Sequence, residues 1–120
     1  MLVDTKEMFS RALAEKFAVP AFNINNMEMV QGIMEGVSAE GSPVILQVSR
    51  GARKYAHPVF LRKFAEAVEE IWPEVPFALH LDHGDTYEVC ADCVDNGFTS
   101  VMIDASSHLF AENIALTKRV

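Results

Sequence analysis

The sequence has few of the features that mark membrane, secreted or nucleic-acid-binding proteins. No apolar run approaches the roughly 18 residues of a membrane-spanning helix, and Asp4, Lys6 and Glu7 interrupt any signal-like segment at the start. Two cysteines are too few for a secreted disulfide framework. The 10 Lys and Arg against 17 Asp and Glu disfavour nucleic acid or an anionic membrane as partner. We therefore expect a cytoplasmic globular protein.

Four strand patterns alternate with helix patterns along the chain. Apolar residues at helical spacing predict a first helix before residue 19, further helices that end near Gly41, Pro73 and Gly97, and a last helix from Leu109. Runs rich in apolar and β-branched residues predict strands at 19–25, 44–49, 77–82 and 100–106. Such alternation favours a parallel sheet with right-handed crossovers.

Local signals refine the helix predictions. Asp4 and Asp85, each followed by a glutamate three residues later, have the spacing of capping boxes. In the first helix, Phe9, Leu13 and Phe17 recur at intervals of four, so we expect that face to pack against the core.

An open doubly wound sheet and half of a (β/α)₈ barrel both fit four βα units after a leading helix. The segment Asn23-Ile24-Asn25-Asn26 after the first strand has no glycine, so the G-x-G-x-x-G dinucleotide fingerprint is absent, and no G-x-x-x-x-G-K-[ST] loop occurs. A complete barrel needs about 250 residues. The last helix pattern reaches Val120 without a stop signal. We expect residues 1–120 to be the N-terminal portion of one barrel domain whose C-terminal half is absent.

Each predicted strand is apolar at its start and polar at its carboxyl end. Strand termination alone would explain one such change, but four in succession favour a shared polar site, since the carboxyl ends of barrel strands converge on one rim. The polar residues are Asn23 and Asn25, Gln47 and Ser49, Asp82 and His83, and Asp104, Ser106 and Ser107.

The stretch "LHLDHGD" (79–85) is the densest group of titratable residues. Alternation along the strand places His80 and Asp82 on one face, and His83 lies just beyond the strand. His83 is placed to offer a ring nitrogen to a metal, and Asp82, beside a cation, to hold or pass a proton. His80 lies deeper and is expected to be a hydrogen-bonded interior histidine.

Four motifs together resemble one family. "VPAFNINN", "VILQVSRGARKY", "ALHLDHGD" and "GFTSVMIDASS…ENIALTK" closely resemble the class II, metal-dependent fructose-bisphosphate aldolases and the related tagatose-bisphosphate aldolases. The resemblance spans essentially the whole chain and implies a TIM barrel, a Zn²⁺ cofactor and a homo-oligomer, dimer or tetramer, in the full-length form. The implied reaction is reversible aldol cleavage of a ketose 1,6-bisphosphate, with fructose 1,6-bisphosphate the expected substrate.

The resemblance also implies residue roles. Asp82 matches the catalytic aspartate, and His83 matches the first of three zinc-binding histidines. Asp104 matches a carboxylate that holds a second or displaced cation, divalent or monovalent. Ser49 matches a contact to the glyceraldehyde 3-phosphate moiety, and Asn23 a residue that orients substrate near the metal.

Other family residues have no match in this chain. The remaining two zinc histidines, the glutamate base and the glycine-rich phosphate loop belong to later strands, and His57 and His108 do not match the ligand positions. One histidine is a poor zinc site, because a catalytic site needs three protein ligands. We expect residues 1–120 alone to bind zinc weakly and to show no aldolase turnover.

Two further motifs have plain structural interpretations. "CADC" (90–93) has the spacing of a redox or zinc pair, but it lies within a helical pattern, so we expect two core-facing cysteines. "SRGARKY" (49–55) is expected to be a solvated charged loop, with a phosphate-attracting rim as an equal alternative.

Two rival hypotheses remain. A metal-dependent barrel hydrolase would use His80 as well as His83 as a ligand. A non-catalytic assembly module would use a second copy to cover the open edges of a half-barrel sheet.

Overall fold

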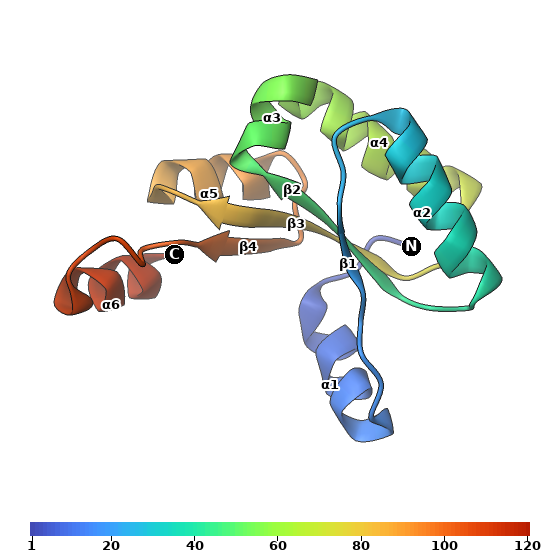
Figure 1. The fold of residues 1–120 in the computed structure, drawn as a ribbon, viewed down its shortest axis with the longest axis horizontal. Helices are drawn as coiled ribbons and strands as arrows, with labels where there is room; N and C mark the ends of the chain where they lie inside the picture. The colour runs from blue at the N-terminus through green and yellow to red at the C-terminus, as the bar shows by residue number, and fades with distance from the viewer.

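The computed structural model describes all residues from 1 to 120, and its centre is one parallel sheet with the strand order β1-β2-β3-β4 (Figure 1). The strands are β1 (Ala21–Asn23), β2 (Val44–Ser49), β3 (Phe77–Gly84) and β4 (Ser100–Ile103). The helices are α1 (Thr5–Glu15), α2 (Met27–Ala39), α3 (Arg50–Ala56), α4 (Pro58–Ile71), α5 (Tyr87–Asp95) and α6 (Phe110–Arg119). The predicted α/β fold with parallel pairing is confirmed.

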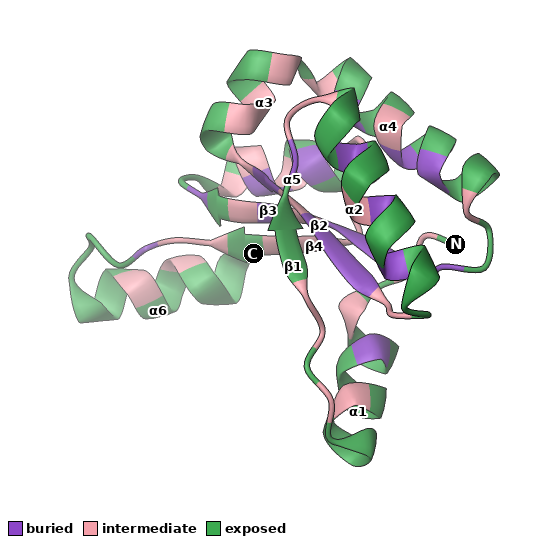
Figure 2. Ribbon diagram, turned by 45° about the vertical axis from the view of Figure 1, so that its right-hand side comes forward, coloured by how far each residue is buried: buried purple, intermediate pink, exposed green.

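The crossover helices α2, α4 and α5 pack on the same face of the sheet. Each strand turns alternate apolar side chains toward that face, and these join the buried residues of the three helices in one cluster. Figure 2 shows the buried residues gathered in β2 and in the sides of α2 and α4 next to it. A complete doubly wound sheet carries crossover helices on both faces and reverses its strand order at a switch point, so the sequential order and single helix layer here favour the half-barrel alternative.

The opposite face of the sheet is polar near the strand ends and apolar only near the strand starts. There Met8 of α1 packs against Ile45 and Ala78 in a small second cluster. Further along the strands, Asn23, Gln47, His80 and Ser100 form one row across the sheet, because the register pairs each with the next. This face of the sheet therefore has an apolar half near the strand starts and a polar half near the carboxyl ends of the strands.

The interpretation of "SRGARKY" as a loop is wrong. Residues 50–56 form α3, and the Ser49 hydroxyl accepts a hydrogen bond from the backbone N–H of Ala52 at 3.2 Å. Ser is a favoured N-cap residue, and Ala, Arg and Lys have high helix propensity. The charged residues of this segment favour a loop, but the serine cap and the helix-forming residues produce a short helix.

Several other boundaries and packing predictions are corrected by the structure. Strands β1 and β4 are shorter than expected, and β3 continues to Gly84. Thr86 rather than Asp85 caps α5, since its hydroxyl accepts from the N–H of Val89. In α1, Phe9 is 50% exposed and Leu13 84%, whereas Met8 is buried. Docking of Met8 beneath the sheet fixes the rotation of α1, so Phe9 and Leu13 of the predicted apolar face point away from the core.

No helix of the structure has the length and apolar character needed to cross a membrane.

Candidate functional site at the carboxyl ends of the strands

A hydrogen-bonded row of side chains connects the carboxyl ends of all four strands. The amide nitrogen Nε2 of Gln47 on β2 donates to Asn23 Oδ1 on β1 at 2.5 Å and to Asp82 Oδ2 on β3 at 3.4 Å. On the other side, His83 Nδ1 lies 2.7 Å from Asp104 Oδ2, just after β4. The structure thus brings together four of the five predicted site residues, with Gln47 between two of them.

A β-bulge explains how Asp82 and His83 reach the same rim. Consecutive strand residues point to opposite faces, yet His83 Nε2 lies 3.7 Å from Asp82 Oδ1. The pairing between β3 and β4 shifts register between Leu81 and Gly84, and His83 adopts the left-handed conformation with φ 55°. Bulges redirect side chains in this way and are frequent beside active sites.

Gly84 is needed for the close packing beneath the bulge. A Cβ atom at this position would lie 2.8 Å from a methyl carbon of Leu81, 3.0 Å from the Cys90 sulfur and 3.1 Å from the carbonyl oxygen of Met102. The Gly84 carbonyl also accepts a hydrogen bond from the N–H of Asp104 at 2.8 Å. This packing ties the bulge to the start of the loop that carries Asp104.

The histidine and the carboxylate of this group alter each other's protonation. The hydrogen bond that the His83 ring donates to Asp104 raises the pKa of His83, with a further contribution from the charge of Asp82. The pKa of Asp104 lies well below its usual range, because Ser106 and His83 both hydrogen-bond to its carboxylate. The contact with Asp104 occupies Nδ1 of the imidazole, and Nε2 is the nitrogen that faces Asp82.

The metal-ligating groups of residues 1–120 are sparse. No cluster of three or more His, Cys, Asp or Glu side chains is arranged to hold a metal ion. His83 contributes one imidazole nitrogen, and the carboxylate on its other nitrogen has the arrangement that orients metal-binding histidines. Residues 1–120 therefore offer a single imidazole nitrogen with an orienting carboxylate at this rim.

His80 lies on the same face as Asp82 but deeper. Its ring Nδ1 lies 2.8 Å from the Ser100 hydroxyl, and burial lowers the pKa of the ring against the opposing effect of Asp82. This contact agrees with the expected interior, hydrogen-bonded histidine.

Ser49 is separate from the hydrogen-bonded row. It is paired with Asp82 in the strand register, but its hydroxyl caps α3. The arginines that follow Ser49 are also engaged: Arg50 forms an ion pair with Asp85 at 2.6 Å, and Arg53 forms one with Asp92. Carboxylates thus neutralise both arginine charges beside the rim.

The two cysteines face the core, as expected from their helical setting. Cys90 is 2% exposed and Cys93 fully buried, and both thiols are free. Burial raises the pKa of Cys93 to about 11. This arrangement lacks the exposed, low-pKa thiol of a redox pair.

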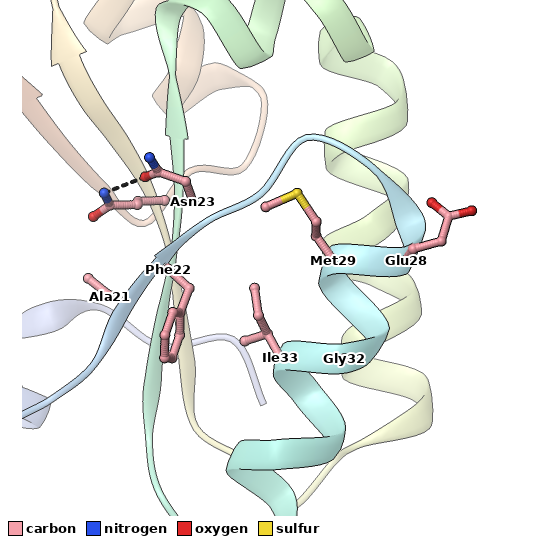
Figure 3. Close-up of a pocket in the computed structure, with 8 residues that line it drawn as sticks. Ala21, Phe22, Asn23, Glu28, Met29, Gly32 and Ile33 are labelled. Carbon is pink, nitrogen blue, oxygen red and sulfur yellow. Dashed lines mark hydrogen bonds between the residues drawn. The ribbon is translucent and has the colours of Figure 1, made fainter.

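An open groove of about 570 Å³ runs beside the free edge of β1. Phe22 of β1 and Ile33 of α2 project into the space between these elements, and Glu28 points away from it (Figure 3). Asn23 and Gln47 line the end of the groove, and the dashed line at Asn23 marks their hydrogen bond (Figure 3). The hydrogen-bonded row is therefore accessible from the β1 side.

Comparison with known proteins agrees with the motif resemblance. The family described as "Fructose-bisphosphate aldolase class-II" matches residues 3–120. A fructose-bisphosphate aldolase of Treponema pallidum (strain Nichols) is 48% identical over 123 residues, which cover 99% of this chain and 37% of that protein. A fructose-bisphosphate aldolase of Giardia intestinalis is 51% identical over 119 residues, again 99% of this chain and 37% of the relative.

Solved structures give the same result. The YdjI aldolase from Escherichia coli K12 superposes with a TM-score of 0.90 at 31% identity, over 98% of this chain and 44% of that one. The chain therefore belongs to the class II fructose-bisphosphate aldolase family. It spans a little over a third of the length of the curated relatives named here.

Proposed function

We propose that residues 1–120 form the N-terminal half of a (β/α)₈ barrel in a zinc-dependent class II aldolase. The reaction is the reversible cleavage of fructose 1,6-bisphosphate to dihydroxyacetone phosphate and glyceraldehyde 3-phosphate. The supporting observation is the placement of Asp82 and His83 at one rim, 3.7 Å apart, in a member of this family. A sheet with its crossover helices on one face also suits half a barrel.

His83 is proposed as a zinc ligand through Nε2, because Asp104 engages the other ring nitrogen. A bound zinc ion would supply a Lewis acid for the negative charge that develops on substrate oxygens. Since residues 1–120 offer one histidine at this rim, the other ligands would come from the second half of the barrel. Asp104 orients the His83 ring and is the candidate for a second cation.

Asp82 is proposed to handle the proton of the reacting hydroxyl. In cleavage its carboxylate removes the hydroxyl proton as the carbon–carbon bond breaks, and in condensation it returns the proton to the aldehyde oxygen. One carboxylate oxygen accepts from Gln47 and the other faces His83. These neighbours hold the carboxylate at the rim while leaving its side chain 20% exposed to substrate.

Asn23 and Ser49 are proposed to contact substrate. Asn23 lies at the end of the β1 groove, and Ser49 is beside Asp82 in the register. The working form is proposed to be a cytoplasmic homo-oligomer of the complete barrel.

A chimaera tests the function directly. This chain, joined to the remainder of the Treponema pallidum aldolase that it matches, is expected to cleave fructose 1,6-bisphosphate in the presence of zinc. The isolated 120-residue chain is expected to show no turnover. A folded, zinc-loaded chimaera that fails to cleave the substrate would refute the proposal.

Zinc affinity gives a readout that does not depend on activity. His83→Ala in the chimaera is expected to weaken zinc binding by at least about tenfold, measured by competition with a chelator. His57→Ala, at the start of α4, is the matched control and should leave the affinity unchanged.

The hydrolase alternative is separated from the aldolase by His80. A hydrolase would need His80 as a direct ligand, whereas its Nδ1 is engaged by Ser100. Near-normal zinc affinity in His80→Asn favours the aldolase, and a loss equal to that of His83→Ala would favour the hydrolase.

A further inference from the structure

The amide of Gln47 lies at the centre of the hydrogen-bonded row. We propose that Gln47 is a positioning residue that holds Asn23 Oδ1 and Asp82 Oδ2 through its amide nitrogen and so directs the NH₂ group of Asn23 toward the substrate. The inference rests on the proposed function for the identity of the substrate. The fixed orientation of the Asn23 side chain does not depend on which substrate binds.

The strand register places Gln47 where it can contact both neighbours. On β2 it pairs with Asn23 on β1 and with His80 on β3, so the carboxylate of Asp82 is two residues further along β3. Its Nε2 atom reaches both Asn23 Oδ1 and Asp82 Oδ2. A side chain of different length at this position would miss one of the two contacts.

The donor and acceptor pattern of Gln47 leaves one consistent orientation. A carboxylate oxygen accepts hydrogen bonds, so the amide of Gln47 must turn its nitrogen, and not its oxygen, toward Asp82. The nitrogen carries two N–H groups, and the second is directed at Asn23. Asn23 must then present its carbonyl oxygen to Gln47.

The same pattern determines what Asn23 can offer to a ligand. With Oδ1 held by Gln47, Nδ2 of Asn23 is directed away from the row, and it has no hydrogen-bond partner within the chain. Asn23 is exposed and lines the groove beside β1. A fixed N–H donor at this place suits an oxygen acceptor such as a sugar hydroxyl or a phosphate oxygen, and disfavours a ligand that offers only donors.

Side-chain NMR of the 120-residue chain tests the orientation without requiring catalysis. In the wild-type protein the Asn23 NH₂ group is expected to be rigid on the ps–ns timescale while its protons exchange with water. Gln47→Met keeps the length of the side chain but removes the amide, and is expected to make the Asn23 NH₂ group mobile. Gln31→Met, at an exposed glutamine on α2, is the matched control and should leave Asn23 unchanged.

Gln47→Glu is a second variant, which is expected to hold the Asn23 amide in the reversed orientation and not to make it mobile. A carboxylate accepts hydrogen bonds and cannot donate to Asn23 Oδ1, so the Asn23 amide is expected to reverse and donate Nδ2–H to Glu. Its NH₂ protons should then shift downfield and exchange more slowly than in the wild type. An Asn23 NH₂ group with the same order and proton shifts in the wild type and both variants would overturn the proposal. Because this readout is conformational, its failure is distinguishable from a failure of the aldolase assignment.

Discussion

Asp82 and His83 are consecutive residues of β3, yet their side chains face the same rim, with His83 Nε2 3.7 Å from Asp82 Oδ1. The bulge between Leu81 and Gly84 produces this arrangement, which a regular strand would not allow. The close packing at Gly84 maintains the bulge, and Asp104 and His80 lie beside it.

Gly84→Ala should destabilise the protein by about 1–3 kcal/mol, because the new methyl group would overlap atoms that already pack closely. The carbonyl oxygen of Met102, 3.1 Å from the Cβ position, is backbone and cannot move as freely as a side chain. Urea denaturation measures the change in the free energy of unfolding.

Gly36→Ala is the matched control for this prediction. Gly36 lies in α2 with nothing within 4 Å of its Cβ position. Replacing an exposed helical glycine by alanine should stabilise the protein by about 0.5–1 kcal/mol. Equal effects of the two substitutions would show that the site beneath the bulge is not tightly packed.

Asp104→Asn tests whether the carboxylate orients the His83 ring. In the zinc-binding chimaera the substitution should weaken zinc affinity by about 10–100-fold, as expected when an orienting partner is lost. Asp95→Asn at the exposed end of α5 makes the same charge change and serves as control. Unchanged affinity in Asp104→Asn would show that the 2.7 Å contact with His83 Nδ1 does not determine metal binding.

His80 should make stability depend on pH below its ordinary pKa of 6.5. Burial lowers the pKa of His80 in the folded state, so the unfolded chain binds the proton more readily. Its stabilising contribution is complete above pH 6.5 and is lost as the pH falls through the folded-state pKa. An NMR titration should place the pKa of His80 below 6.5, and His80→Gln should remove this part of the pH dependence. A value at or above 6.5 would contradict the burial.

Cys90 and Cys93 should react slowly with a thiol reagent in the native protein. At pH 8, a pKa of about 11 leaves about one Cys93 thiol in a thousand ionised, and the sulfur is also buried. Both thiols should react rapidly after urea denaturation. The absorbance of the thiolate that the reagent releases measures the rate in each state. Rapid reaction of the native protein would mean that the face of α5 that carries them is accessible.

The repeating elements of the fold could be predicted because they depend on local patterns. β-branched runs such as Val44–Ser49 and the helical spacing in α2 and α4 each identify an element without knowledge of its neighbours. The polar strand ends likewise indicated a shared rim, because parallel strands place their carboxyl ends together.

The remaining features depend on contacts between distant parts of the chain. The role of Gln47 required the register of β1, β2 and β3, since only that register places its amide between Asn23 and Asp82. The rotation of α1 depends on the contact between Met8 and Ile45. The spacing of apolar residues within α1 cannot predict that contact, because Ile45 lies on a distant strand. The Ser49 cap had a sequence signal, a serine before a run of helix formers, but the charge of that run indicated a loop.

Catalysis by Asp82 in the chimaera is the most direct test of the proposed aldolase. Asp82→Asn preserves the size of the side chain but removes the proton-accepting carboxylate. The kcat for the cleavage of fructose 1,6-bisphosphate is expected to fall about 10²–10⁴-fold, as for the loss of an acid–base group, with the zinc content unchanged. A variant that retains both its zinc and the kcat of the unmodified chimaera would contradict the assignment of Asp82.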